Sequence, residues 1–271
     1  MPQPCEVIAE VTSRWFRWDE LAAVTFLRRI EFRPETGSTN DDALQSAALN
    51  RPTPLLVIAD SQTGGRGRGR NQWWAKDGAL TFSLVVEPAE FGIVQSRWPL
   101  LSLATALAVA DTLDEFAAGC LIGLKWPNDL QLNRKKVCGI LVETLPGRSD
   151  RLVIGIGLNV RNSLQDAPAE LRDIATSIVD ETGFEWELTD VLTRLLQCLE
   201  DRLTKLGANE IALQTEWARH CVLTGRRVSL EAAGQRVEGM CRGIDVSGAI
   251  VLEDDNGQRK SCFGGVVRVL S

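Results

Sequence analysis

Residues 65 to 74 of this 271-residue chain read Gly-Arg-Gly-Arg-Gly-Arg-Asn-Gln-Trp-Trp and follow an apolar, strand-like segment at residues 55 to 59. Glycines let backbone amides approach an anion closely, and arginines supply forked donors that match phosphate or carboxylate oxygens. Arg-Gly repeats also occur in RNA-binding segments, and a basic stretch is most often a solvated surface. The stretch therefore indicates an anion-binding loop only in combination with other motifs.

A second motif places a lysine and a carboxylate at neighbouring strand ends. It reads Lys-Trp-Pro-Asn-Asp over residues 125 to 129, and a Val/Ile/Leu-rich run follows Lys136. Pro127 is incompatible with the interior of a helix, and the run after Lys136 has the composition of a buried strand. We expect two short extended segments joined by a polar turn.

The segment at residues 37 to 42, Gly-Ser-Thr-Asn-Asp-Asp, has the composition of a helix start. Ser38 or Thr39 would cap the helix, and Asp41 and Asp42 would complement its dipole. Capping accounts for these residues without any ligand.

Along the chain these motifs follow one another as Ser38-Thr39-Asn40, Gln62 to Trp73, Lys125 to Asp129, Lys136 with Gly139 to Glu143, and Gly157-Leu158-Asn159. In this order they closely resemble the biotin protein ligases, which attach biotin to the carrier domain of biotin-dependent carboxylases. The resemblance covers most of residues 36 to 160. It implies an α+β fold with a mixed β-sheet catalytic domain, class II synthetase-like and of the biotin/lipoate ligase type, over residues 1 to 222. A small C-terminal SH3-like β-barrel over residues 223 to 271 also fits the resemblance.

The resemblance implies a two-step reaction. Biotin and ATP, accompanied by Mg²⁺, form biotinyl-5′-adenylate and pyrophosphate, and a lysine of a biotin carboxyl carrier protein then attacks the mixed anhydride. The first step brings a carboxylate to a polyphosphate, and Coulomb repulsion opposes this approach in a dry site. We therefore expect positively charged side chains between the two reactants. We expect no set of protein ligands for a metal ion. We expect the protein to be a monomer or a homodimer.

Matching the family's motifs residue by residue gives the implied site. Lys136 would stabilise charge between the biotin carboxylate and the α-phosphate, Arg68 would be a loop cation, and Asp129 would orient or deprotonate the carrier amine. The implied biotin-binding residues are Ser38, Thr39, Asn40, Gln62, Gly65, Arg66, Gly67 and Lys136. The implied adenylate-binding residues are Arg68, Trp73, Asn128 and Asn159, with Trp73 able to stack on adenine.

The chain departs from the commonest form of the glycine-arginine loop. Gly69, Arg70 and Asn71 stand where Arg, Gly and Arg are expected. The two arginines ranked highest, Arg66 and Arg68, are preserved. Arg70 is shifted by one place from the third basic position, so we expect looser loop closure.

Charge and composition exclude several classes of protein. The net charge of -6 disfavours a general nucleic-acid binder, whereas residues 60 to 76 hold four basic residues and one acidic residue. Seven cysteines without a C-x-x-C pair argue against a disulfide framework or structural zinc. The single histidine, His220, makes Ser-His chemistry improbable.

The N-terminal sequence and the hydropathy of the chain lead us to expect a cytoplasmic protein. No run of eighteen apolar residues occurs, and the N-terminus has Glu6 and Glu10 in place of a basic region. We expect no membrane partner. About 37 residues precede Ser38, which is too short for the DNA-binding winged helix of some family members, so we expect neither repressor function nor nucleic-acid binding.

Periodicity and turn residues predict a mixed sheet with helices on one side, followed by a small all-β unit. In the first part we expect strands at residues 30–32, 55–60, 79–87, 121–126, 129–132, 137–145 and 152–160, and helices at 40–49 and 97–116. A leucine-rich stripe from Leu188 to Leu206 predicts a core helix, and residues 210–219 predict another. We expect strands at 226–230, 237–244, 249–253, 259–263 and 266–270, with Asn256-Gly257 as a two-residue hairpin turn.

Other functions remain open at this point. A lipoate or octanoyl ligase shares the fold and the adenylate chemistry, although the arginine-rich loop with Gln62 favours biotin. An RNA-binding module without catalysis would use the Arg-Gly run, but no aromatic residue is interleaved with the arginines. An inactive relative that binds adenylate without transferring it is a third alternative.

Overall fold

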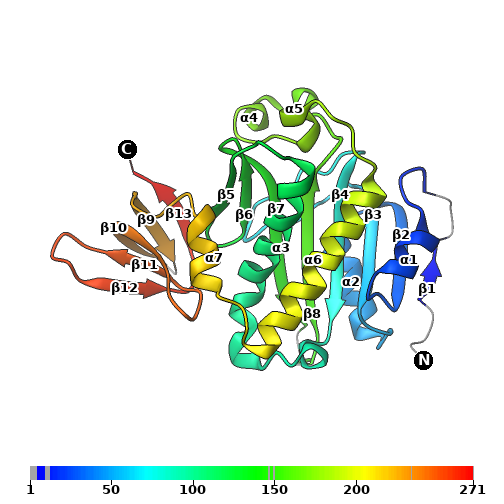
Figure 1. Cartoon of the computed structure of the whole chain (residues 1–271), viewed down its shortest axis with the longest axis horizontal. Coiled ribbons are helices and arrows are strands. Elements are labelled where there is room, and N and C mark those ends of the chain that lie inside the picture. The colour runs from blue at the N-terminus through cyan, green and yellow to red at the C-terminus, as the bar shows by residue number, and fades with distance from the viewer. Residues whose placement is uncertain (1–4, 10–12, 146, 149, 233, 271) are drawn as a thin grey trace.

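The computed structural model describes residues 5–9, 13–145, 147–148, 150–232 and 234–270. Two β-sheets organise these residues, an eight-stranded sheet and a five-stranded sheet. Figure 1 shows the five-stranded sheet at one end of the molecule, beyond the β5 and β6 side of the larger sheet.

The larger sheet has the strand order β1-β2-β3-β4-β8-β7-β6-β5. Its strands are β1 (Glu6–Ile8), β2 (Arg29–Thr36), β3 (Leu55–Gln62), β4 (Ala79–Val86), β5 (Ile122–Lys125), β6 (Asp129–Leu132), β7 (Lys135–Thr144) and β8 (Leu152–Asn159). The first three strands pair in parallel and all other neighbours pair antiparallel. The expected mixed sheet is therefore confirmed.

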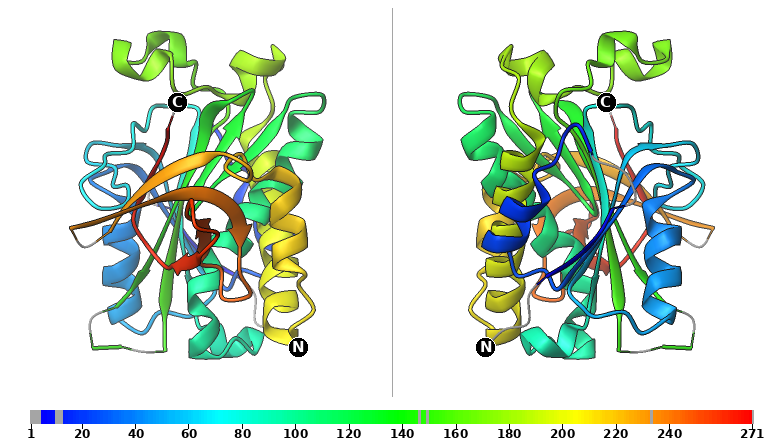
Figure 2. Two further views of the ribbon diagram at one scale, coloured as in Figure 1. Left: turned by 90° about the vertical axis from the view of Figure 1, so that its left-hand side faces the viewer. Right: turned by 90° about the vertical axis from the view of Figure 1, so that its right-hand side faces the viewer.

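Helices cover both faces of the larger sheet, so the expectation of helices on one side was wrong. The helices are α1 (Trp18–Val24), α2 (Thr39–Ala48), α3 (Leu101–Phe116), α4 (Ala169–Arg172), α5 (Ile178–Thr182), α6 (Leu188–Ala208) and α7 (Leu213–His220). Figure 2 shows the sheet edge-on, with α2 on one side and α3 and α6 on the other. Helix α2 buries Ala43 and Ala47 against Val57, Val85 and Val153 in a small core of its own.

The main core lies on the α3 and α6 face. The predicted leucine stripe of α6 is buried throughout, which confirms that helix. The helix expected over residues 97–116 begins instead at Leu101, after a 3₁₀ segment, η2 (Gln95–Leu100). Pro99 lies in that segment and has no N–H to donate, which a helix tolerates only near its first turn. Two further 3₁₀ segments are η1 (Pro88–Phe91) and η3 (Leu164–Asp166).

The second sheet has the order β12-β11-β10-β9-β13 and is antiparallel. Its strands are β9 (Arg227–Ala232), β10 (Gln235–Ile244), β11 (Ile250–Glu253), β12 (Arg259–Cys262) and β13 (Val266–Val269). Among the described residues no pairing joins β12 to β13, so the expected barrel is an open, curved sheet (Figure 2). The β11–β12 hairpin is confirmed, but its loop is longer than two residues, since Asp254 N donates to Gln258 O and Gly257 has φ +77°.

Three contacts fix the second sheet beside strand β5. Val222 N donates to Leu124 O at 3.0 Å, and Cys221 forms a parallel bridge with Leu124. The indole Nε1 of Trp126, just after β5, donates at 3.0 Å to Gly248 O in the turn between β10 and β11 of the second sheet. The segment that connects the two sheets therefore lies along the outer edge of β5.

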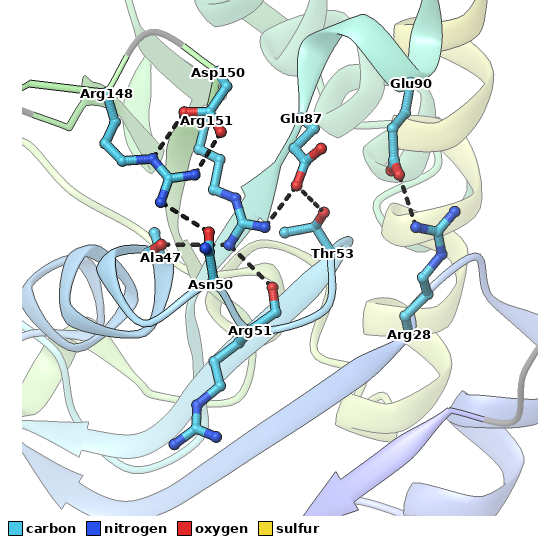
Figure 3. A network of polar contacts seen from close by, with 10 residues as sticks. All are labelled: Arg28, Ala47, Asn50, Arg51, Thr53, Glu87, Glu90, Arg148, Asp150 and Arg151. Carbon is cyan, nitrogen blue, oxygen red and sulfur yellow. Dashed lines mark hydrogen bonds and ion pairs between the residues drawn. The ribbon is translucent and has the colours of Figure 1, made fainter.

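A polar network fixes one end of the central strands (Figure 3). The buried guanidinium of Arg151, just before β8, donates to Glu87 Oε1 at 2.6 Å and to the carbonyl oxygens of Ala47 and Arg51. A buried charge is tolerated when paired and hydrogen-bonded in this way. At the opposite end, β4 begins at Ala79, shortly after the glycine-arginine loop, and pairs there with the last residue of β8, Asn159.

Candidate active site

A cavity of about 560 Å³ lies on the α2 side of the larger sheet, and the second sheet contributes to its wall. Its lining comes from the start of α2, the end of β3, the glycine-arginine loop, strands β4 to β8, and β9 and β13 with the two glycines before β13. Eleven of the thirteen predicted site residues line it. They are Ser38, Thr39, Asn40, Gln62, Arg66, Gly67, Arg68, Trp73, Asn128, Asp129 and Lys136.

Strand β7 directs Lys136 into this cavity through a β-bulge. Cys138 pairs with Leu130 and Lys136 pairs with Gln131, so β7 has one residue more than β6 at this point, Val137. Side chains alternate between faces along a strand, and Lys136 would otherwise face away from Gly139, three residues later. A bulge re-aims side chains in this way and is frequent near active sites.

Lys136 is paired with the other predicted catalytic residue of this region. Its Nζ lies 2.7 Å from Asp129 Oδ1, with side-chain exposures of 37% and 26%. A Cβ at Gly139 would be 3.3 Å from the same Nζ, so the ammonium lies above the backbone of β7. The pair is solvent-accessible and can therefore exchange partners when an anion enters.

Trp73 lies flat against two strands where glycines leave room for it. A Cβ at Gly157 would be 2.3 Å from Trp73 Cε2, and one at Gly139 would be 3.5 Å from Cζ3. Gly139 and Gly157 face each other across β7 and β8. The Nζ of Lys136 is 5.8 Å from the indole centroid, within cation–π range.

The glycine-arginine loop forms a tight hairpin. Gly67 N donates to Asn71 O at 2.8 Å, and Arg66 pairs with Gln72. Gly69 has φ +69° at the turn, a conformation that favours glycine. The departure from the family's commonest loop sequence therefore places a glycine at the turn, and Arg70 is exposed there, outside the cavity lining.

Arg66 binds carboxylates of the protein itself. Its Nη1 donates to Glu143 Oε1 at 3.1 Å, its Nη2 donates to Glu143 Oε2, and its Nε lies 3.1 Å from Asp41 Oδ1. Glu143 is on β7 and Asp41 is on α2. Arg66, expected as a ligand-binding loop cation, thus links the loop to the sheet and to α2.

Arg68 links the loop to the second sheet. Its Nη1 donates to Gly265 O at 2.7 Å, and a Cβ at Gly264 would be 3.2 Å from its Nη2. Gly265 has φ +133°, and a Cβ there would be 2.7 Å from Glu231 O, so a side chain is excluded. The guanidinium of Arg68 therefore meets a neutral acceptor and keeps its charge available.

Neutral polar groups form the end of the cavity nearest α2. Gln62 Oε1 accepts from Thr39 N at 2.7 Å and from Thr39 Oγ1 at 3.2 Å. Ser83 Oγ donates to Asn40 Oδ1 at 2.6 Å, and Asn40 Nδ2 donates to Glu143 Oε2 at 2.7 Å. Gln62 thus takes the capping role that was expected of Ser38 or Thr39. Ser38 occupies the N-cap position of α2 without a side-chain cap bond.

Two predicted residues lie outside the cavity lining. Gly65 O accepts from Trp73 N at 2.9 Å, and a Cβ at Gly65 would be 2.5 Å from Trp73 O, so Gly65 serves the loop backbone. Asn159 is buried, donates to Thr176 O at 2.9 Å and accepts from Asn162 Nδ2 at 3.0 Å. The structure therefore does not bring Asn159 to the cavity, because its amide is used within the protein.

Cys138 of strand β7 is a packing residue. It is fully buried in the main core, and burial raises the pKa of its thiol far above the ordinary value. A thiolate nucleophile requires the opposite shift. The chemistry at this strand therefore belongs to its neighbours.

The structure adds lining or supporting residues that the sequence reasoning did not select. They are Ser83, Lys125, Glu143, Glu231, Gly264 and Gly265. Ser83 and Glu143 lie within predicted strands, and an isolated polar residue in an apolar strand was the available signal. For the residues of the second sheet, no signal in the sequence indicated proximity to the loop.

Comparisons with known proteins agree on one family. Residues 30–159 match the Biotin/lipoate A/B protein ligase family, and residues 223–268 match the Biotin protein ligase C terminal domain. The chain is 34% identical over 228 residues to the bifunctional ligase/repressor BirA of Bacillus subtilis, which covers 82% of this chain and 69% of that protein. It is 34% identical over 230 residues to the biotin--[acetyl-CoA-carboxylase] ligase of Mycobacterium tuberculosis, covering 83% and 84%. The solved biotin protein ligase from Aquifex aeolicus in complex with biotin and ATP matches with a TM-score of 0.77 at 28% identity, over 89% of this chain and 99% of that chain.

The Arg66–Glu143 contact predicts how firmly the loop is held. Glu143→Gln removes the negative charge opposite Arg66 while keeping an amide oxygen for Asn40, so the loop should open more often. We expect trypsin to cleave at residues 66 to 70 several-fold faster in this variant, because local opening limits proteolysis. Fragment masses over time measure the rate.

Asp150→Asn is the matched control, because it also removes a carboxylate paired with an arginine, Arg148, but lies away from the loop. Equal loop cleavage in the wild type and in Glu143→Gln would show that the contact does not hold the loop.

Proposed function

This chain belongs to the biotin protein ligase family, and on that premise we propose that it joins biotin to ATP as biotinyl-5′-adenylate and transfers the biotin to a lysine of a biotin carboxyl carrier protein. The observation that carries the proposal is the order of chemistry along the cavity. Neutral hydrogen-bonding groups lie at the α2 end, where Arg66 is paired with Asp41 and Glu143, and Lys136 follows at β7.

The neutral end suits the ureido ring of biotin, which offers two N–H donors and one carbonyl acceptor. Ser38 is buried at the cavity wall, and its hydroxyl is not used to cap α2. Thr81 Oγ1 and Trp73 Nε1 are buried without a partner among the described residues, and both residues line the cavity. Because buried polar atoms are generally hydrogen-bonded, these atoms favour a polar ligand.

In the first step a carboxylate oxygen of biotin forms a bond to the α-phosphorus, and the bond from that phosphorus to the bridging oxygen breaks. Lys136 offsets the repulsion between the two anions as they approach and stabilises the charge that develops at the α-phosphate. In the resting protein Asp129 holds this ammonium 2.7 Å away in the cavity. Arg68 supplies a second positive charge over the adenylate.

In the second step the carrier amine attacks the acyl carbon and AMP leaves. Only the neutral amine is nucleophilic, and a lysine is mostly protonated near pH 7. We assign Asp129 to accept that proton once Lys136 has turned to the phosphate. Trp73 and Asn128 lie beside the adenylate, and Asn128 is held by its donation to Ile140 O at 2.7 Å.

Mg²⁺ fits this cavity as a companion of the nucleotide. Two carboxylates among the described residues line the cavity. Asp129 pairs with Lys136, and Glu231 Oε1 lies 3.9 Å from Arg268 Nη1. Mg²⁺ keeps several waters and binds phosphate oxygens readily, so it needs few protein ligands. When bound, it would neutralise part of the phosphate charge.

We also propose that the reaction takes place in the cytoplasm, where ATP is present and thiols stay reduced. All seven cysteines are free in the structure, in accord with a reducing compartment. No helix in the described part of the chain is long and apolar enough to cross a membrane.

The substrate test uses the pure protein with labelled ATP and either biotin or lipoate. We expect an acid-labile adenylate with biotin and little with lipoate, because the rigid polar end of the cavity fits a fused bicyclic ring. An adenylate formed with lipoate instead would assign the chain to the other branch of the family. Absence of any adenylate would contradict the proposal.

Lys136→Ala should abolish most biotin-dependent exchange of pyrophosphate into ATP. Removing one preorganised donor at a developing charge lowers rates by about 10² to 10³. Exchange kinetics measure the loss, and circular dichroism confirms the fold. Exchange at the wild-type rate would remove Lys136 from the mechanism.

Arg68→Gly should retain adenylate synthesis but release the intermediate into solution, because the loop loses its cation and its link to Gly265. Filtration of a reaction without carrier separates bound from free adenylate. Arg70→Gly is the matched control, since Arg70 is an exposed arginine of the same loop. Equal retention by both variants would contradict the role of Arg68.

A further inference from the structure

The charges around the cavity are not equally available to a ligand. Four basic side chains line it: Arg66, Arg68, Lys125 and Lys136. Arg66 is paired with Glu143 and Asp41, and Lys136 is paired with Asp129. In the part of the chain that the structure describes, Arg68 donates only to a carbonyl, and Lys125 has neither an ion pair nor a side-chain hydrogen bond. Among the described residues, Lys125 is thus a cavity cation without an ion-pair partner, and Asp129, opposite it on β6, is paired with Lys136.

Strand register places Lys125 on the same face as the proposed chemistry. Lys125 pairs with Asp129, Asp129 pairs with Gly139, and Gly139 pairs with Gly157. Residues directly opposite each other on neighbouring strands project to the same face of the sheet. Lys125 therefore lies in one row with Asp129 and with the two glycines beneath Trp73.

The row also gives the spacing between the two lysines. Adjacent strands lie about 4.8 Å apart, so Lys125 on β5 is about 10 Å from Gly139 on β7. The Nζ of Lys136 lies above Gly139, and the proposed first step brings the α-phosphate beside this ammonium. A phosphate chain that begins beside Lys136 and extends toward β5 would reach the side chain of Lys125.

The geometry of the proposed adenylation favours a phosphate chain of ATP that extends from Lys136 toward β5. In phosphoryl and nucleotidyl transfer the attacking and leaving oxygens lie roughly in line on opposite sides of the phosphorus. The neutral biotin end lies at α2, β3 and β4, and β8 and β7 separate it from β6 and β5. Attack from the biotin end therefore directs the leaving group toward β5.

We propose that Lys125 binds the β- and γ-phosphates of ATP and the departing pyrophosphate, a role that rests on the proposed adenylation. As the bond from the α-phosphorus to the bridging oxygen breaks, the electron pair goes to that oxygen. The pyrophosphate thereby gains one negative charge, which the ammonium of Lys125 stabilises without a proton transfer. Lys136 and Lys125 thus divide the work, with one at the attacking side and one at the leaving side.

The two half-reactions separate this role from a general effect on the site. Lys125→Ala should raise the KM for pyrophosphate and for ATP in the exchange reaction roughly ten- to a hundredfold, the worth of one charged hydrogen bond. Transfer from preformed biotinyl-5′-adenylate to the carrier contains no pyrophosphate and should change by less than about twofold. Lys125→Arg should restore most of the affinity because it retains the charge.

Lys135→Ala is the matched control, since Lys135 is a lysine of β7 outside the cavity lining, bonded to Arg172 O. Calorimetry with inorganic pyrophosphate gives a readout that does not depend on catalysis, and binding should weaken in Lys125→Ala alone. An equal loss in both half-reactions, or unchanged KM values and unchanged pyrophosphate binding, would overturn the assignment. A wild-type protein that catalyses neither half-reaction would instead refute the proposed function.

Discussion

The side chain of Lys136 reaches the cavity only because β7 has one residue more than β6 at Val137. The inserted residue reverses the alternation of the strand, so that Lys136 shares a face with Asp129 and Gly139. Val137 and Cys138 are then both buried in the main core, which fixes the bulge from behind. The position of a solvent-accessible ammonium thus depends on apolar packing on the other side of the sheet.

The arginines of the glycine-rich loop differ in what they bind, although they look alike in the sequence. Arg66 satisfies carboxylates on β7 and α2, while Arg68 reaches a carbonyl of the second sheet. Glu143 also accepts from Asn40, so the loop and the polar end of the cavity share one acceptor. Arg66 therefore fixes the position of the loop, while Arg68, two residues later, keeps its positive charge available for an anionic ligand.

Much of this arrangement could be predicted from the sequence, because its motifs are local and periodic. The mixed sheet, the core helix α6 and eleven of the cavity residues follow from strand patterns and from the family resemblance. The use of Arg66 as a link and the internal bonding of Asn159 could not be predicted, since each depends on side chains distant along the chain. The same holds for Gln62, which caps α2 from β3. Bulge position and the openness of the second sheet depend on pairing register, which residue composition does not specify.

The bridge between Cys221 and Leu124 has a consequence for how this protein meets other proteins. A free strand edge invites intermolecular pairing and, with it, aggregation. The connecting segment occupies part of that edge at β5, next to the Lys-Trp-Pro-Asn-Asp motif. Among the described strands, the opposite edge is β1, which is only three residues long. On the β5 side, next to the proposed site, the connecting segment therefore hinders a strand of another protein from pairing with the large sheet.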